Sequence, residues 1–239
     1  MKVIIKKELY SFLASPIGYV AIGVFLVVNG LFLWILKNNF NILNAGFADL
    51  NSFFYLIPWV FILLIPSITM KMIADEYRLG TIEILLTKPI TTWQLIIGKY
   101  IAALILILIS LSFTLIYVIS IYYLANPLGN IDIGVIIGSY LGLLFLASAF
   151  VSIGLFTSSL HHNQMIAFIT GVLFSYLLFD GFEQIATLLS TETLNIELLG
   201  LYYHYKSISK GVIDTRDIIY FISVTFFFLY LTKLNLSYE

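Results

Sequence analysis

The chain has 239 residues, of which 61% are hydrophobic and only 10% are charged, and its mean hydropathy is +1.02. A soluble globular chain carries about 25% charged residues, so this composition indicates an integral membrane protein. Its 12 basic and 13 acidic residues give a net charge of -1, which argues against a nucleic-acid partner, and the lack of cysteine excludes disulfides, thiolate catalysis and Cys-ligated metal sites.

Ahead of the first long apolar segment, residues 1–15 have the pattern of an amphipathic helix. Apolar side chains recur on one helical face, namely Ile5, Leu9, Phe12 and Leu13. Ser15 and Pro16 then break the helix. We expect this segment to lie in the membrane interface, and a plain cytoplasmic extension of the first span is the alternative.

Six apolar segments are long enough to cross a bilayer, since about 20 helical residues span a hydrocarbon core of ~30 Å. The predicted spans are residues 17–36, 53–72, 99–122, 133–156, 164–179 and 218–231. Six spans put both termini on one side. The positive-inside rule makes that side the cytoplasm, because it carries eight of the 12 basic residues: Lys2, Lys6, Lys7, Lys71, Arg78, Lys88, Lys99 and Lys233.

Two spans carry residues that affect helix packing. Pro58 and Pro66 remove backbone donors from the second span, so neighbouring helices must accommodate bends there. The fourth span repeats Gly134, Gly138 and Gly142 at four-residue spacing, which predicts a smooth face that another helix can approach closely. Chance spacing of glycines is the alternative.

Between the second and third spans, residues 71–98 form a charged cytoplasmic region. The second span is predicted to continue as a helix to Leu79 and to stop at Gly80. Thr81 then begins a short amphipathic helix that Pro89 ends. The residues of interest in this compact unit are Glu76, Arg78, Gly80, Thr81, Glu83, Leu85, Leu86 and Pro89. A solvated connector is the alternative.

The third span begins with an N-terminal capping signal, and the last one follows a long connection. Thr91 and Gln94 have the spacing of a capping box before the third span. Residues 180–217 are too long and too rich in leucine for an ordinary loop, so we expect short external helices that re-enter the bilayer. A solvated external cap is the alternative. Asp214 is predicted to cap the last span.

The predicted spans offer few side chains that could take part in proton transfer or catalysis. Their interiors contain no acidic, basic or histidine residue, which makes proton coupling unfavourable as a mechanism, although sodium sites built from carbonyl and hydroxyl groups would escape this test. No phosphate-binding loop is present. We therefore expect no catalytic site on this chain, and any ATP hydrolysis must occur on another polypeptide.

Several segments resemble the ABC-2 type permeases. They are Ile-Pro-Ser-Ile-Thr-Met at 65–70, the charged run at 76–89, the opening segment at 6–19, Gly-Lys-Tyr at 98–100, Gly-Leu-Phe-Thr-Ser-Ser-Leu at 154–160 and the late run at 211–217. Together they are similar to the permease subunits associated with bacterial gliding motility.

The resemblance implies an all-α, polytopic half-transporter, with residues 1–239 forming a single ABC-2 transmembrane domain in a bacterial inner membrane. Its partners would be a dimer of ABC ATPase subunits, which hold ATP and Mg, and a second permease subunit, with a heterodimer expected and a homodimer open. No cofactor is expected on this chain. Residues 76–89 would couple the ATPases to the spans.

Three functions follow, in order of preference. The first is the permease subunit of an ATP-driven exporter. The second is a module that uses ATP-driven movement to act on an envelope protein without transporting a substrate. The third is an ion-coupled secondary transporter, which the lack of charges in the span interiors disfavours.

Overall fold

The computed structural model describes residues 1–44, 46–86, 90–189 and 196–238, and these residues contain helices and turns without any strand. Six helical stretches in the described part are long and apolar enough to cross a membrane: Gly18–Ile35, Asn51–Arg78, Thr92–Leu124, Ile133–Ser159, Gln164–Leu188 and Thr215–Ser237. The prediction of an all-α polytopic fold with six candidate spans is confirmed.

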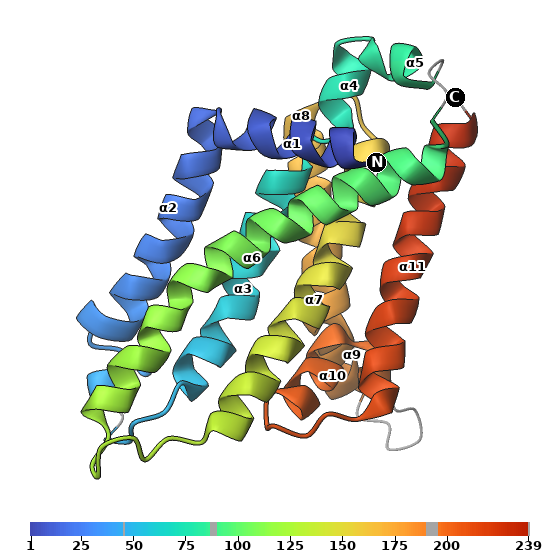
Figure 1. Cartoon of the computed structure of the whole chain (residues 1–239). Coiled ribbons are helices and arrows are strands. Elements are labelled where there is room, and N and C mark those ends of the chain that lie inside the picture. Colours follow the sequence, from blue (N-terminus) through green and yellow to red (C-terminus); the bar gives the residue numbers. More distant parts are fainter. Residues whose placement is uncertain (45, 87–89, 190–195, 239) are drawn as a thin grey trace.

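The long helices form one bundle around α7 (Figure 1). They are α2 (Pro16–Gly30), α3 (Asn51–Thr69), α6 (Thr92–Leu124), α7 (Ile133–Ser159), α8 (Gln164–Tyr176) and α11 (Thr215–Tyr238). α7 packs against α3, α6, α8 and α11. α1 (Lys2–Leu13) lies across one end of the bundle, where α4 (Ala74–Arg78), α5 (Thr81–Leu86) and both termini are also found.

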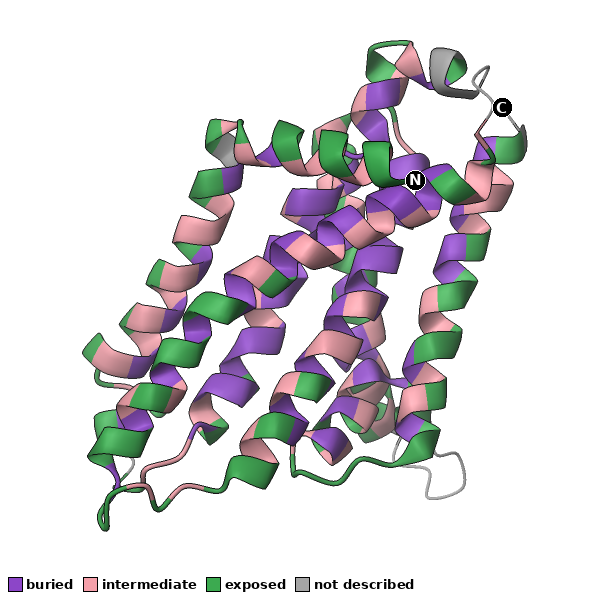
Figure 2. Cartoon of the chain, in the orientation of Figure 1, coloured by how far each residue is buried: buried purple, intermediate pink, exposed green. Residues whose placement is uncertain are grey.

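Buried and exposed residues lie on different faces of the long helices (Figure 2). Inward faces of α3, α6 and α7 are buried and include large aromatic side chains such as Phe53, Phe61 and Phe150. α2 presents many exposed apolar side chains, among them Val20 and Val24. In a membrane protein the outer face meets lipid, so this exposure matches a helix at the lipid boundary.

Helices α2 and α6 both begin at residues whose side chains cap the helix N-terminus. Ser15 caps α2, accepting the Gly18 N–H at 3.3 Å, with Pro16 as the first helical residue. Thr91 and Gln94 form the predicted capping box at the start of α6. These contacts satisfy N–H groups that a helix start leaves unpaired.

Gly138 and Gly142 of α7 face α10 (Leu201–Ile208), a short helix at the other end of the bundle. A methyl group on Gly138 would lie 2.9 Å from the Gly211 Cα atom, and one on Gly142 would lie 3.1 Å from Ile208. Gly134 is different, because a methyl group there would meet only the Asp132 side chain of its own helix start.

This arrangement predicts opposite outcomes for two matched substitutions. Gly138→Ala should lower the free energy of unfolding by about 1–3 kcal/mol, because the backbone around Gly211 must move. Gly134→Ala should be neutral or stabilising, since alanine favours helix over glycine. Unfolding in mixed micelles, followed by circular dichroism, measures both. Equal effects would contradict close packing of α10 on α7.

After the fifth span, short helices pack back onto the bundle. α9 (Phe182–Leu189), the 3₁₀ turn η4 (Ile196–Leu199) and α10 lie against the π-helical turn η3 (Leu177–Gly181), α7 and α11. The Tyr205 hydroxyl of α10 donates to the Phe54 carbonyl of α3 at 2.6 Å. Burial raises the pKa of Tyr205 well above its ordinary value, so this hydroxyl keeps its proton.

Candidate functional site: a charged junction beneath the coupling region

The second span does not continue as an unbroken helix to Leu79, which corrects the sequence expectation. α3 ends at Thr69, and α4 begins only after a turn at residues 70–73. The side chain of Ser158, from α7, bridges the break. Its hydroxyl donates to the Met70 carbonyl at 3.0 Å and accepts the backbone N–H groups of Ile73 and Ala74 at 3.2 and 3.1 Å.

A buried lysine lies directly beside this turn. Lys99 of α6 is 1% exposed, and its ammonium donates to the Met72 carbonyl within the turn. It also lies 2.8 Å from the Glu76 carboxylate of α4 and 2.9 Å from the Glu8 carboxylate of α1. One ammonium therefore joins three helices and a free backbone carbonyl, which is the arrangement that makes a buried charge tolerable.

A second lysine completes the charge balance. Lys7 of α1 lies 2.9 Å from Glu76 and 3.7 Å from Glu8, so two ammonium groups face two carboxylates. Burial acts to lower the pKa of Lys7, but its hydrogen bond to Glu76 and the charges of Glu76 and Glu8 outweigh that effect and raise the pKa. The stabilising contribution of Lys7 is therefore present at neutral pH and is lost only as pH rises through this raised pKa.

Further contacts hold α4 from the side of α8. The Gln164 amide at the start of α8 donates to the Asp75 carboxylate, which also pairs with Arg78 at 3.0 Å. The Tyr77 ring lies 5.0 Å from the ring of His162, in the turn between α7 and α8. α4 is thus fixed to α1, α6, α7 and α8 at once.

α5 follows α4 through a glycine in the left-handed conformation. Gly80 has a φ of +66°, which side-chain-bearing residues adopt at a cost, and this allows the chain to turn sharply between the two short helices. The Thr81 hydroxyl donates to the Glu76 carbonyl at 3.3 Å. Ile82 is buried, whereas Glu83 and Leu79 are exposed at this end of the molecule.

The predicted coupling residues therefore divide into two groups. Glu76 is buried and points toward Lys99, so it serves as an internal anchor instead of a surface contact. Arg78 and Glu83 are exposed. Pro89 and the side chains of Leu85 and Leu86 lie outside the described residues.

Sequence reasoning missed the roles of Glu8, Lys99 and Ser158 at this junction. For Lys99 there was a signal: a lone lysine at the eighth position of a long apolar helix must find partners or reach the surface. The role of Glu8 was harder to predict from the sequence, because it lies 91 residues from its partner Lys99 in the chain. Ser158 gave none.

Five of the segments that carry the family resemblance meet here. A methyl group on Gly154 would lie 2.2 Å from the Thr69 hydroxyl, so segments 154–160 and 65–70 touch at a glycine. One on Gly98 would lie 3.0 Å from Ile4, at the contact between α6 and α1. Lys99 then links segment 98–100 to Glu8 of the opening segment and to Glu76 of the charged run.

Comparison with protein families agrees with this arrangement. No individually curated protein matches the sequence significantly. The family model described as "ABC-2 family transporter protein" matches residues 3–234, which is nearly the whole chain. Permeases of this family are multi-pass membrane components of ABC exporters, and their ATPase is a separate subunit. This chain belongs to the ABC-2 transporter family, as a transmembrane permease subunit.

Proposed function

We propose that residues 71–98 are the coupling region through which a dimer of ABC ATPase subunits, holding ATP and Mg, drives this permease. The observation that carries the proposal is the contrast between α4 and α5. α4 is tied to α1, α6, α7 and α8 by buried or partly buried polar contacts, whereas α5 follows a glycine turn and exposes Glu83. A push on α5 is thereby delivered to four helices through α4.

The physical requirement is a two-state response. A partner moves this bundle only if it binds one arrangement of the helices more tightly than another. Helices joined by buried ion pairs and by backbone bonds to Ser158 move together, because separating them would leave charges and carbonyl groups unpaired. The junction therefore transmits displacement from α4 to the ends of α3, α6 and α7.

Cross-linking tests where the ATPase binds. The chain has no native cysteine, so Glu83→Cys provides a single thiol on the exposed side of α5. A short bifunctional reagent should join it to the ATPase subunit of the native complex, with a yield that depends on nucleotide. Leu128→Cys is the control, because this exposed residue lies in the connection between α6 and α7, which Figure 1 shows at the opposite end of the bundle. Equal yields from both positions would remove the support for docking at α5.

A substitution at Gly80 should separate coupling from folding. A Cβ atom at Gly80 would meet no atom of the described residues within 4 Å, so the main cost of Gly80→Val comes from its φ of +66°. We expect about 1–3 kcal/mol of local strain, intact spans and a severalfold loss of ATP hydrolysis coupled to movement. Gly80→Asn should retain most of the coupling, because asparagine tolerates this conformation. The ATPase rate of the reconstituted complex is the measurement, and an active Gly80→Val variant would contradict this role.

Placement in the cell is part of the proposal. We place the chain in a bacterial inner membrane with both termini cytoplasmic, which the distribution of basic residues supports. Both termini lie at the end of the bundle that carries α4 and α5, so cytoplasmic termini would put the coupling region on the side from which the ATPase acts (Figure 1). Protease accessibility in oriented vesicles checks this, since a site added after the C-terminus should be cleaved only in inside-out vesicles.

A narrower assignment rests on sequence similarity alone. The segments quoted above resemble permease subunits associated with gliding motility, so we propose a heterodimer with a second, different permease. Purification in mild detergent should then recover the ATPase and a second permease together. Recovery of this chain with the ATPase alone would favour a homodimer instead.

The alternative function is a module that transmits movement to an envelope protein. It is favoured by the helices α9, η4 and α10, which place several exposed side chains at the end of the bundle opposite α5. ATP-driven cross-linking of an envelope protein to this end, in vesicles where no solute moves, would support the alternative over export.

A further inference from the structure

One side of α1 holds this helix to the bundle. Ile4 lies against Gly98 of α6, since a methyl group on that glycine would come within 3.0 Å of the Ile4 side chain. Glu8 pairs with the buried Lys99, and Phe12 is itself buried. Ile4, Glu8 and Phe12 follow one another at four-residue spacing, so they form one row along the helix. The side of α1 opposite this row faces away from the bundle.

Two other rows of side chains run along the outward part of α1. The first, which we call the basic row, is fully exposed and consists of Lys2, Lys6 and Tyr10. The second, which we call the apolar row, is half-buried and consists of Ile5, Leu9 and Leu13. The rows are offset by three residues, so their side chains are neighbours on the helix surface. All six residues line one groove of about 370 Å³.

The two lysines of the basic row have no acidic partner. Neither Lys2 nor Lys6 forms an ion pair with a described residue, whereas Lys7 pairs with Glu76. The Lys6 ammonium lies 5.7 Å from the centre of the Tyr10 ring, so this side chain extends along its own row. Residues four apart on a helix have Cβ atoms about 5–6 Å from each other, so both long side chains reach a single phosphate.

α1 lies at the level where a bilayer meets water. The chain passes from α1 through a break at Ser15 into α2, whose apolar span begins at Gly18. Figure 1 shows α1 lying across the end of the bundle instead of extending α2. At this level a lysine keeps its ammonium among the headgroups while apolar side chains contact the acyl chains. Tyrosine is also enriched there.

We propose that the groove on α1 binds an anionic phospholipid of the phosphatidylglycerol class. Its phosphate lies between the ammonium groups of Lys2 and Lys6, and the start of one acyl chain lies along the apolar row. The described residues that line the groove include two cations and no carboxylate, so a negative headgroup meets attraction alone. A zwitterionic headgroup would bring its own cation beside the lysines. The groove and α5 share no described residue, so its failure would leave the coupling proposal unaffected.

Photolabelling of the purified full chain in phosphatidylcholine vesicles tests the site. The probe is a trace of phosphatidylglycerol with a photoactivatable group near the start of one acyl chain, and the matched probe has a choline headgroup. We expect the glycerol probe to label residues 1–15 at least about fivefold more than the choline probe, because two lysines favour the negative headgroup. Equal labelling by the two probes would overturn the proposal.

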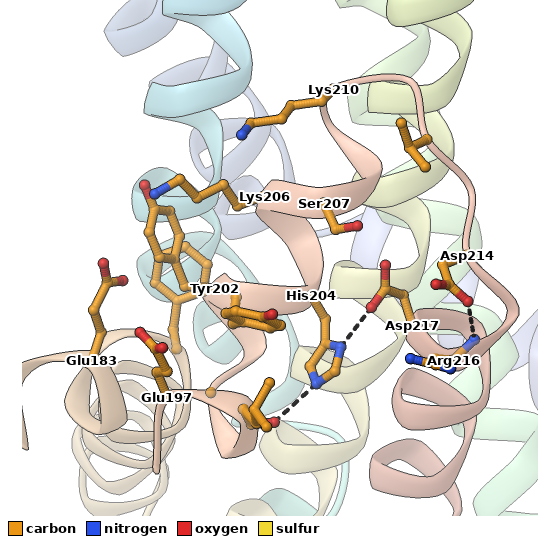
Figure 3. A pocket seen from close by; sticks show the side chains of 15 residues that line it. Glu183, Glu197, Tyr202, His204, Lys206, Ser207, Lys210, Asp214, Arg216 and Asp217 are labelled. Atoms are coloured by element: carbon orange, nitrogen blue, oxygen red, sulfur yellow. Dashed lines mark hydrogen bonds and ion pairs between the residues drawn. The ribbon is translucent and has the colours of Figure 1, made fainter. Parts of the chain in front are cut away.

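Paired substitutions locate the charge contact. Lys2→Gln together with Lys6→Gln should reduce the preference to less than about twofold without disturbing the fold, since both residues are exposed. Lys206→Gln together with Lys210→Gln is the matched control. It removes the same charge from two exposed lysines, also four residues apart, which line a pocket in and beside α10 (Figure 3). A preference that survives the first pair, or that falls equally in both, would contradict the assignment.

Leu9→Ala separates the acyl contact from the headgroup contact. The smaller side chain shortens the apolar row but leaves both lysines, so labelling by the two probes should fall by a similar factor and the preference should remain. Circular dichroism checks that the helices are retained. Unchanged labelling would contradict the position of the acyl chain, and a lost preference would contradict the role of the lysines.

The native complex distinguishes a lipid from a protein as the occupant. With the ATPase bound, the glycerol probe should still label residues 1–15. If ATPase binding abolished the labelling and the thiol of Lys6→Cys were cross-linked to the ATPase instead, the groove would be a protein contact and the proposal would fail.

Discussion

Lys99→Met should lower the free energy of unfolding by about 3–5 kcal/mol, because the largely buried Glu76 and Glu8 carboxylates lose their buried ammonium partner and keep only the half-exposed Lys7 among the described residues. It also removes the donor to the Met72 carbonyl in the turn. Denaturant unfolding in mixed micelles measures the loss. We expect ATP hydrolysis coupled to movement to fall with it, because α4 is no longer held to α6.

Lys7→Met is the control, since it removes a cation from the same Glu76 carboxylate at nearly the same distance. The Lys7 side chain is 55% exposed, so water replaces much of what it provides, and its loss should be far smaller than that of Lys99. Converting Glu8 and Glu76 to glutamine in the Lys99→Met background should restore part of the stability. If the two lysine variants lost equal stability, burial of the charge would not be the cause.

Gly154→Ala should lower the free energy of unfolding by about 1–3 kcal/mol and impair coupling, although alanine is the better helix former. Its methyl group would lie 2.2 Å from the Thr69 hydroxyl and 3.0 Å from Thr69 Cβ, so α3 and α7 must separate. Thr69 ends α3 immediately before the turn at residues 70–73, and a shift there would pull the backbone away from Ser158. Unfolding and coupled ATPase assays on the same preparation measure both effects.

Gly23→Ala is the comparison and should be neutral or stabilising, because a methyl group at Gly23 of α2 would meet no atom of the described residues within 4 Å. Thr69→Ala in the Gly154→Ala background should recover part of the lost stability by removing the blocking atoms. A double variant as unstable as the single one would show that another contact of α7 is responsible.

Local patterns predicted those parts of the fold that depend on neighbouring residues. The helix break at Ser15 and Pro16, the capping box at Thr91 and the helix end at Gly80 each depend on a few consecutive residues, so the sequence alone indicated them. Long apolar stretches likewise predicted six spans, because length and hydropathy are properties of each segment by itself.

Contacts between residues that lie far apart in the sequence could not be predicted from local patterns. The break after Thr69 is stabilised by Ser158 and Lys99, and neither lies near it in the chain. Continuous helix was the better expectation from residues 66–79, because nothing among them supplies an alternative partner for the freed backbone groups. The inward direction of Glu76 depends on the same long-range contacts, so the sequence indicated a residue of the coupling region but not its burial beside Lys99.

α3 also connects the two ends of the molecule. The Tyr205 hydroxyl of α10 holds its beginning at Phe54, and Ser158 holds the turn that follows its end. The 19-residue helix α3 is roughly 28 Å long, so a single helix connects these two contacts. A partner that binds at the α10 end and changes nucleotide affinity on the ATPases by some factor must, by thermodynamic reciprocity, have its own affinity changed by nucleotide by the same factor.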